Sequence, residues 1–200
     1  MRKDLFSAVL SAALVLAPMG VALSAQDDLS GFTLEQLNAA IRSSGAGAQK
    51  IYSILTFDSE DRQGSNLAML SSSRSGWHIT VLHRVEGGLK VVWRSGNLPQ
   101  DFNVSSSNSL KIEVVEDEQV VEFSGCAPHL CGDVNGVIGV LLYSPSSKQA
   151  FSAHYKYDDR KPLGNFGTLE LSKNANEPGN ERYKAALRKA MSEALRSEVP

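Results

Sequence analysis

The chain has 200 residues, of which 20 are Lys or Arg, 22 are Asp or Glu and 42% are hydrophobic. This near-neutral balance gives no reason to expect nucleic acid as a partner, because proteins that bind nucleic acid gather positive charge against the phosphates. The length fits one domain with a substantial hydrophobic core.

The first 25 residues have the pattern of a secretory signal peptide. Arg2 and Lys3 precede a mostly apolar run from Leu5 to Leu23, and Ala25 offers a cleavage point. A membrane anchor is the alternative interpretation, but proline and glycine interrupt the run and small residues dilute it. We therefore expect residues 26–200 to form a single mature domain that is periplasmic or secreted, with no membrane insertion after cleavage.

A short helix and then a series of strands are predicted for the mature chain. Thr33 and Gln36 have the spacing of a capping box, which predicts a helix to about Arg42. From Lys50 the apolar residues alternate with a period of two, which is typical of a strand. The same alternation predicts further strands at 66–71, 77–85, 89–94, 110–115, 119–123, 137–143, 149–157 and 168–171.

The connections between these strands are short. Residues 86–88 and 116–118 leave no room for a helical crossover, so the sheet is predicted to be antiparallel. Within 77–85, apolar residues occupy one face, whereas His78 and Thr80 share the other. This pattern predicts a sheet with one packed face and one wet face, on which His78 is solvated.

The C-terminal segment is predicted to be an amphipathic helix over about residues 181–197. Its apolar stripe consists of Tyr183, Ala186, Leu187, Ala190, Met191, Ala194 and Leu195. Packing on the sheet is favoured over a role as a membrane-surface or partner helix, because the other face mixes basic and acidic residues. The predicted fold class is therefore α+β, with an antiparallel β-sheet meander flanked by an N-terminal and a C-terminal helix.

The only two cysteines, Cys126 and Cys131, enclose Pro128 and His129 in a six-residue loop. If they pair, as exported cysteines do, the ring must display its middle, because burying it would strand backbone polar groups. Zinc binding through the two cysteines and His129 is an alternative, but no fourth ligand is evident. A thioredoxin-like redox role is disfavoured, because the spacing is Cys-x4-Cys and not Cys-x-x-Cys.

The stretch from Cys126 to about Lys156 resembles the inhibitor of vertebrate lysozyme family. The loop Cys126-Ala127-Pro128-His129-Leu130-Cys131-Gly132 is followed by a strand-like run, 137–143, a turn with serine and lysine, and 149–153. Members of that family are exported bacterial proteins whose Cys-Lys-Pro-His-x-Cys loop plugs the active cleft of animal-type lysozymes. The resemblance implies a sheet with flanking helices, no enzymatic activity and no cofactor.

The resemblance also implies the partner and the contact residues. The partner would be a lysozyme-type glycoside hydrolase, and the contacts would come from Ala127, Pro128, His129 and Leu130. His129 would reach the two catalytic carboxyl groups. Ala127 replaces the usual lysine and Leu130 replaces a frequent acidic residue, so any long-range attraction from those charges is absent.

Two other interpretations remain open. The chain can be a cell-envelope binding or interaction module in which the loop is only a structural staple. An enzyme is disfavoured, because the sequence contains no Gly-x-Ser-x-Gly, His-Glu-x-x-His or glycine-rich phosphate loop. His78 and His83 are five residues apart in one predicted strand and therefore project from opposite faces. His154 falls on the polar side of its strand, with Ser152 and Lys156.

Overall fold

The computed structural model describes residues 33–43, 49–59, 62–96, 98, 104, 109–127, 135–158 and 167–198. The predicted signal peptide lies outside them. In chain order the elements are α1 (Leu34–Ser43), β1 (Lys50–Ser59), β2 (Arg62–Ser73), β3 (Gly76–Val85), β4 (Gly88–Arg94), β5 (Leu110–Val115), β6 (Glu118–Ala127), β7 (Asn135–Ser144), β8 (Gln149–Asp158), β9 (Gly167–Leu171), the short 3₁₀ helix η1 (Asn174–Asn176) and α2 (Glu181–Glu198).

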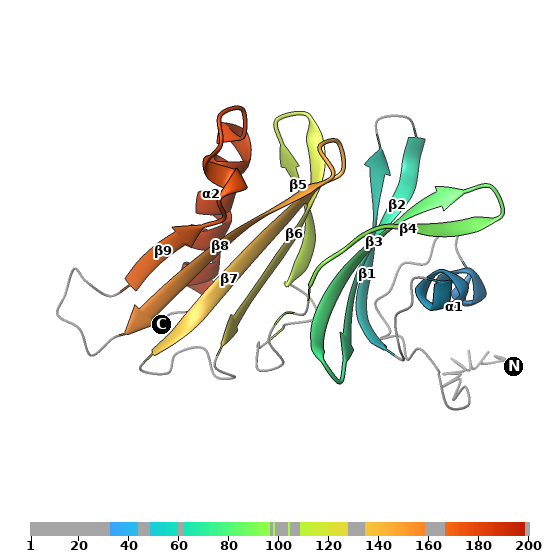
Figure 1. The fold of residues 1–200 in the computed structure, drawn as a ribbon, viewed down its shortest axis with the longest axis horizontal. Helices are drawn as coiled ribbons and strands as arrows, with labels where there is room; N and C mark the ends of the chain where they lie inside the picture. Colours follow the sequence, from blue (N-terminus) through green and yellow to red (C-terminus); the bar gives the residue numbers. More distant parts are fainter. Residues whose placement is uncertain are drawn as a thin grey trace, which may run out of the picture.

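The described strands form two antiparallel sheets. The first has the order β1-β2-β3-β4 and the second the order β5-β6-β7-β8-β9. Figure 1 shows them side by side along the long axis of the molecule. The antiparallel α+β class is confirmed, but the expectation of one continuous meander is wrong, because β4 and β5 do not pair. A strongly twisted meander of so many strands tends to split into packed sheets.

Helix α1 begins at the predicted capping box. The Thr33 N–H donates to Gln36 Oε1 at 3.0 Å, and the Gln36 N–H donates to Thr33 Oγ1 at 3.1 Å. A register shift between Ile51 and Ser53 turns both Ile51 and Ile54 toward the helix. The first core joins α1 to the first sheet and consists of Leu37, Ala40, Ile41, Ile51, Ile54, Leu67, Met69 and Leu82.

A second core joins the two sheets to each other. It combines residues of β1, β2 and β3 with Leu110, Val121, Phe123 and Tyr143 of the second sheet. The ring of Trp93 on β4 stacks on that of Tyr143 at a centroid distance of 4.5 Å and an interplanar angle of 21°. Side-chain contact therefore replaces the backbone pairing that β4 and β5 lack.

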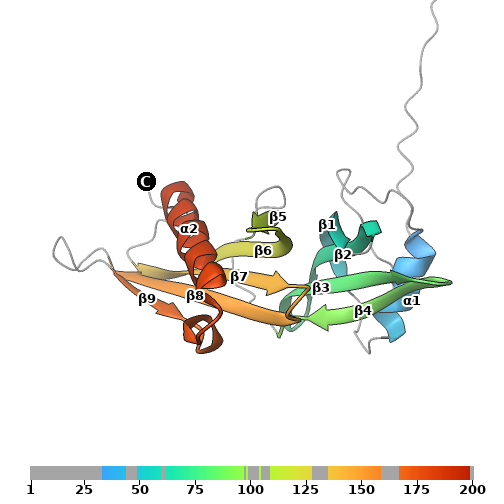
Figure 2. The same cartoon turned by 90° about the horizontal axis from the view of Figure 1, so that it is seen from above.

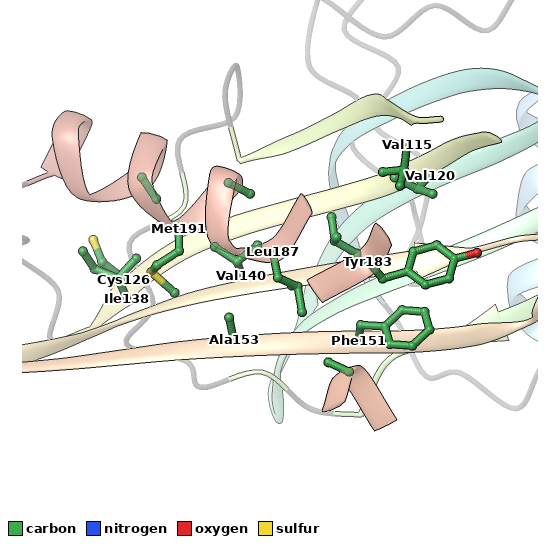
Figure 3. Packing of buried hydrophobic residues seen from close by; sticks show 14 residues of the cluster. Val115, Val120, Cys126, Ile138, Val140, Phe151, Ala153, Tyr183, Leu187 and Met191 are labelled. Atoms are coloured by element: carbon green, nitrogen blue, oxygen red, sulfur yellow. The ribbon is translucent and has the colours of Figure 1, made fainter. Parts of the chain in front are cut away.

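Helix α2 covers one face of the second sheet, at the opposite end of the molecule from α1 (Figures 1 and 2). The predicted apolar stripe forms this third core, in which Leu187 is fully buried and Met191 is 2% exposed. Figure 3 shows it against Val140, Phe151 and other strand residues. The Phe151 and Tyr183 rings stack at 4.3 Å. The predicted C-terminal helix is thus confirmed as packed on the sheet.

The prediction of a wet face on β3 is wrong. His78 and Thr80 are each only 3% exposed, and Leu82 on the same face packs in the core that contains α1. The opposite face, with Ile79 and Val81, packs toward the second sheet. In the described part of the chain, no helix has the length and apolar character that crossing a membrane requires.

Candidate functional site

The cysteine loop predicted as the contact site joins β6 to β7. Ala127, the last residue of β6, is half-buried and pairs with Val137 of β7, so the two strand ends that flank the loop are neighbours. Pro128, His129, Leu130 and Cys131 lie outside the described residues. What the structure describes is therefore the base of the loop.

Cys126 anchors that base in the protein core. It is 1% exposed, and its cross-strand partner is Ile138. Figure 3 shows both side chains beside Met191 of α2. Cys126 is disulfide-bonded, and the sequence contains one other cysteine, Cys131. Cys126, the first residue of the motif, is thus a core residue that is packed between the strands and α2.

The hairpin that carries the loop is long and regular. All seven residues from Val121 to Ala127 pair with β7 without a register shift, and β7 pairs with β8 along its whole length from Asn135 to Ser144. β7 is thus paired on both sides, whereas the last residues of β6, from Gly125 to Ala127, pair with β7 alone. Backbone that is already paired loses little further freedom when a partner binds. The hairpin is a rigid support for whatever its end contacts.

A polar cluster lies at the other end of β6. Glu118 accepts hydrogen bonds from the Tyr183 hydroxyl at 2.6 Å, the Ser144 hydroxyl at 2.7 Å and the Ser146 N–H at 2.9 Å. Burial alone would raise the pKa of Glu118, but these hydrogen bonds outweigh it and lower the pKa. Arg182 lies 3.4 Å from the same carboxylate. The carboxylate is fully occupied, so the cluster fixes α2 to the sheet and leaves no free base.

A second charged cluster lies between β5, β6 and α2, around Lys111. Its ammonium group is 2.9 Å from Glu113, 3.2 Å from Glu122 and 3.2 Å from Glu193. Burial works to lower the pKa of Lys111, but the Glu113 hydrogen bond and the Glu122 charge outweigh it and raise the pKa. Burial raises the pKa of Glu122 against the opposing effect of Lys111.

These two clusters were not predicted from the sequence. Glu118 and Tyr183 are 65 residues apart, and Lys111 and Glu193 are 82 apart. Acidic and basic residues scattered on separate strands and a helix give no local pattern from which such contacts can be found. Among the described residues, no group of three or more His, Cys, Asp or Glu side chains is placed to hold a metal ion.

The three described histidines do not form a joint site. His78 is buried on the α1 side of β3, whereas His83 hydrogen-bonds through Nδ1 to Asn66 Oδ1 at 2.8 Å on the other face. Their projection from opposite faces agrees with the prediction. His154 is exposed on β8, also as predicted.

The two charged clusters and the end of the β6–β7 hairpin differ in whether their polar groups are already paired. The Glu118 and Lys111 clusters satisfy their own charges, whereas the end of the β6–β7 hairpin carries the loop whose composition is the most distinctive in the chain. We take that end of the hairpin as the candidate site. Comparisons of the chain with protein families, with characterised proteins and with solved structures found no match.

Proposed function

We propose that the mature protein binds and blocks a lysozyme-type peptidoglycan hydrolase by inserting the loop between β6 and β7 into the catalytic cleft. The observation that carries the proposal is the anchoring of Cys126, 1% exposed in the core and disulfide-bonded, at the base of a Pro-His loop. A loop tied to a rigid hairpin in this way gives up less conformational entropy on docking, which favours tight inhibition.

The chemistry of His129 suits this role. A retaining glycosidase places two carboxyl groups about 5 Å apart, one protonated and one ionised. An imidazole between them donates a hydrogen bond to the carboxylate and accepts from, or donates to, the acid according to its own protonation. Pro128 fixes its own φ and restricts Ala127 to extended geometry. Both effects would hold the imidazole in one orientation.

The residues that flank Pro128 and His129 set the expected character of the interface. Ala127 and Leu130 supply apolar contact to the walls of a cleft and no charge. Association is then not accelerated by charges of the loop, since steering depends on complementary charge at the contact. We expect inhibition to depend on close apolar contact with the cleft and only weakly on the salt concentration.

A cell-wall lysis assay with a C-type lysozyme tests the proposal. Mature protein, residues 26–200, should abolish lysis at micromolar excess, and His129→Ala should weaken inhibition at least tenfold. His154→Ala is the matched control, because His154 is an exposed histidine on β8, and it should inhibit like the unchanged protein. Absence of inhibition by the unchanged protein would remove this class of target.

The burial of Cys126 also favours a second candidate, a cell-envelope interaction module in which the disulfide only staples the hairpin. Capture experiments with several classes of wall-degrading enzyme separate the two. The staple model predicts that His129→Ala captures the same proteins as the unchanged chain. The inhibitor model predicts that this variant loses a lysozyme-type enzyme.

A further inference from the structure

The described residues leave three buried polar side-chain atoms without a hydrogen-bond partner: Asn66 Nδ2, His78 Nδ1 and Arg94 Nε. All three belong to the first sheet, on β2, β3 and β4. Buried polar atoms in folded proteins are nearly always hydrogen-bonded, so each exception needs an explanation such as a bound ion or water. Two of the three, in His78 and Arg94, lie together.

The strand register places these two residues on one face. Arg94 of β4 is opposite Thr80 of β3, and His78 precedes Thr80 by two residues, so all three side chains point to the α1 side of the sheet. Ser71 of β2 pairs with His78 and adds a hydroxyl to the same face. Arg94 also acts on the titration of His78, because its positive charge contributes to a lowered pKa of the imidazole after the larger effect of burial.

The hydrogen bonds of His78 fit either neutral tautomer of its ring, and the direction of the Ser73 contact decides between them. Nε2 lies 3.0 Å from the Ser73 hydroxyl and 3.5 Å from the Ser75 hydroxyl. A serine hydroxyl that donates to Nε2 leaves the proton of the neutral imidazole on Nδ1. In that tautomer His78 Nδ1 is a buried N–H donor on the same face of the sheet as Arg94 Nε, which is also a donor. Neither atom has a hydrogen-bond partner among the described residues.

Arg94 belongs to none of the ion pairs found among the described residues. Burial lowers the pKa of the Arg94 guanidinium, as expected of a cation that lacks a counter-charge. Asp58 of β1 is committed to Gln119. The remaining charged side chains described on α1, β1, β3, β4 and the turns between the strands are exposed: Glu35, Arg42, Lys50, Arg74, Arg84, Glu86 and Lys90.

We propose that His78 and Arg94 form a binding site for a small oxyanion, a carboxylate or a phosphate group. One oxygen accepts from His78 Nδ1–H, while the other oxygens accept from the fork of N–H groups on the Arg94 guanidinium. Arg94 as a residue is half-buried, and its Nε is buried. The site is independent of the proposed inhibitory loop, because it uses the opposite sheet.

Nuclear magnetic resonance of the His78 imidazole in the mature protein tests this site. Sodium phosphate and sodium acetate are titrated separately, with sodium chloride at equal ionic strength as the reference. Bound oxyanion should shift the His78 ring signals in a saturable manner and raise the pKa of His78 by about one unit, because a negative charge favours the protonated ring. Saturation by acetate indicates a carboxylate ligand, and saturation by phosphate indicates a phosphate ligand.

Two variants and a control complete the experiment. Arg94→Gln should abolish the saturable shift, and Arg94→Lys should weaken binding at least tenfold, because lysine keeps the charge but lacks the fork. Lys90→Gln removes the same charge from an exposed position of β4 and should bind like the unchanged protein. An equal shift with chloride, no saturable shift with either oxyanion, or an unchanged response of folded Arg94→Gln would each overturn the site.

Discussion

The two halves of this molecule treat buried polar groups in opposite ways. The ion pairs described above lie within the second sheet and α2, where Glu118 and Lys111 are surrounded by partners. Within the described ranges, the buried polar side-chain atoms without a partner all lie in the first sheet, on Asn66, His78 and Arg94. The second half therefore holds its charges in fixed pairs, whereas the first half contains the two side chains of the proposed oxyanion site.

The largest effect is expected from a substitution in the core between α2 and the second sheet. Leu187 is fully buried under α2, so Leu187→Ala removes apolar contacts and leaves a cavity. Urea unfolding should show a loss of about 2–5 kcal/mol in the free energy of unfolding. Val114→Ala is the control, because Val114 is 64% exposed, and it should change stability by less than about 0.5 kcal/mol. Equal losses in both variants would contradict the described core.

Lys111 tests whether the second half depends on its charge pairing. Lys111→Met leaves the nearly buried Glu122 without a cation, which should cost about 3 kcal/mol, near the lower end for breaking a buried pair, since Lys111 is one-third exposed. The matched variant is Lys189→Met, which removes a lysine whose side chain is 68% exposed and whose contacts are 3.9 Å. It should cost at most about 1 kcal/mol in the same urea experiment.

Tyr183→Phe removes one donor to Glu118 and keeps the stacked ring. Loss of this hydrogen bond should cost about 1.5–3 kcal/mol at pH 7. Because the folded pKa of Glu118 lies below 4.5, its ionised form stabilises the fold above pH 4.5, and this contribution is lost as the pH falls further. The variant should therefore lose less stability between pH 4.5 and pH 3 than the unchanged protein. Parallel curves would contradict the role of Tyr183.

His78 gives the corresponding test for the first half, with a smaller effect at a higher pH. Because its folded pKa lies below 6.5, the unfolded chain takes up a proton more readily, and stability should fall as the pH drops below 6.5. His78→Gln should flatten the unfolding free energy in this range, measured in chloride buffer. His154→Gln, at an exposed position, should keep the fall. A fall that persists in His78→Gln would place its origin elsewhere.

The local elements of this fold could be predicted from the sequence, but their partition into sheets could not. Alternation and turn residues located the strands, and Thr33 with Gln36 located the start of α1. Those signals are short-range. The separation of β4 from β5 depends on contacts such as Trp93 on Tyr143, which join residues far apart in the chain.

The candidate site was predictable to a similar degree. The composition of the Cys126 loop identified the position, but its alternation pattern gave no sign that Cys126 itself packs beneath a helix. His78 shows the opposite failure. A polar residue alternating with apolar ones predicts a wet face, whereas in the fold His78 is only 3% exposed.

The enclosed sulfur of Cys126 has a kinetic consequence. Once the bridge is reduced, an alkylating reagent can reach this thiol only when α2 lifts away from β6 and β7, because the side chain is 1% exposed beneath the helix. The labelling rate then reports how often the end of the helix detaches from the sheet, as hydrogen exchange reports local opening. Alkylation of Cys126 can therefore be used to measure the rate of local opening of α2.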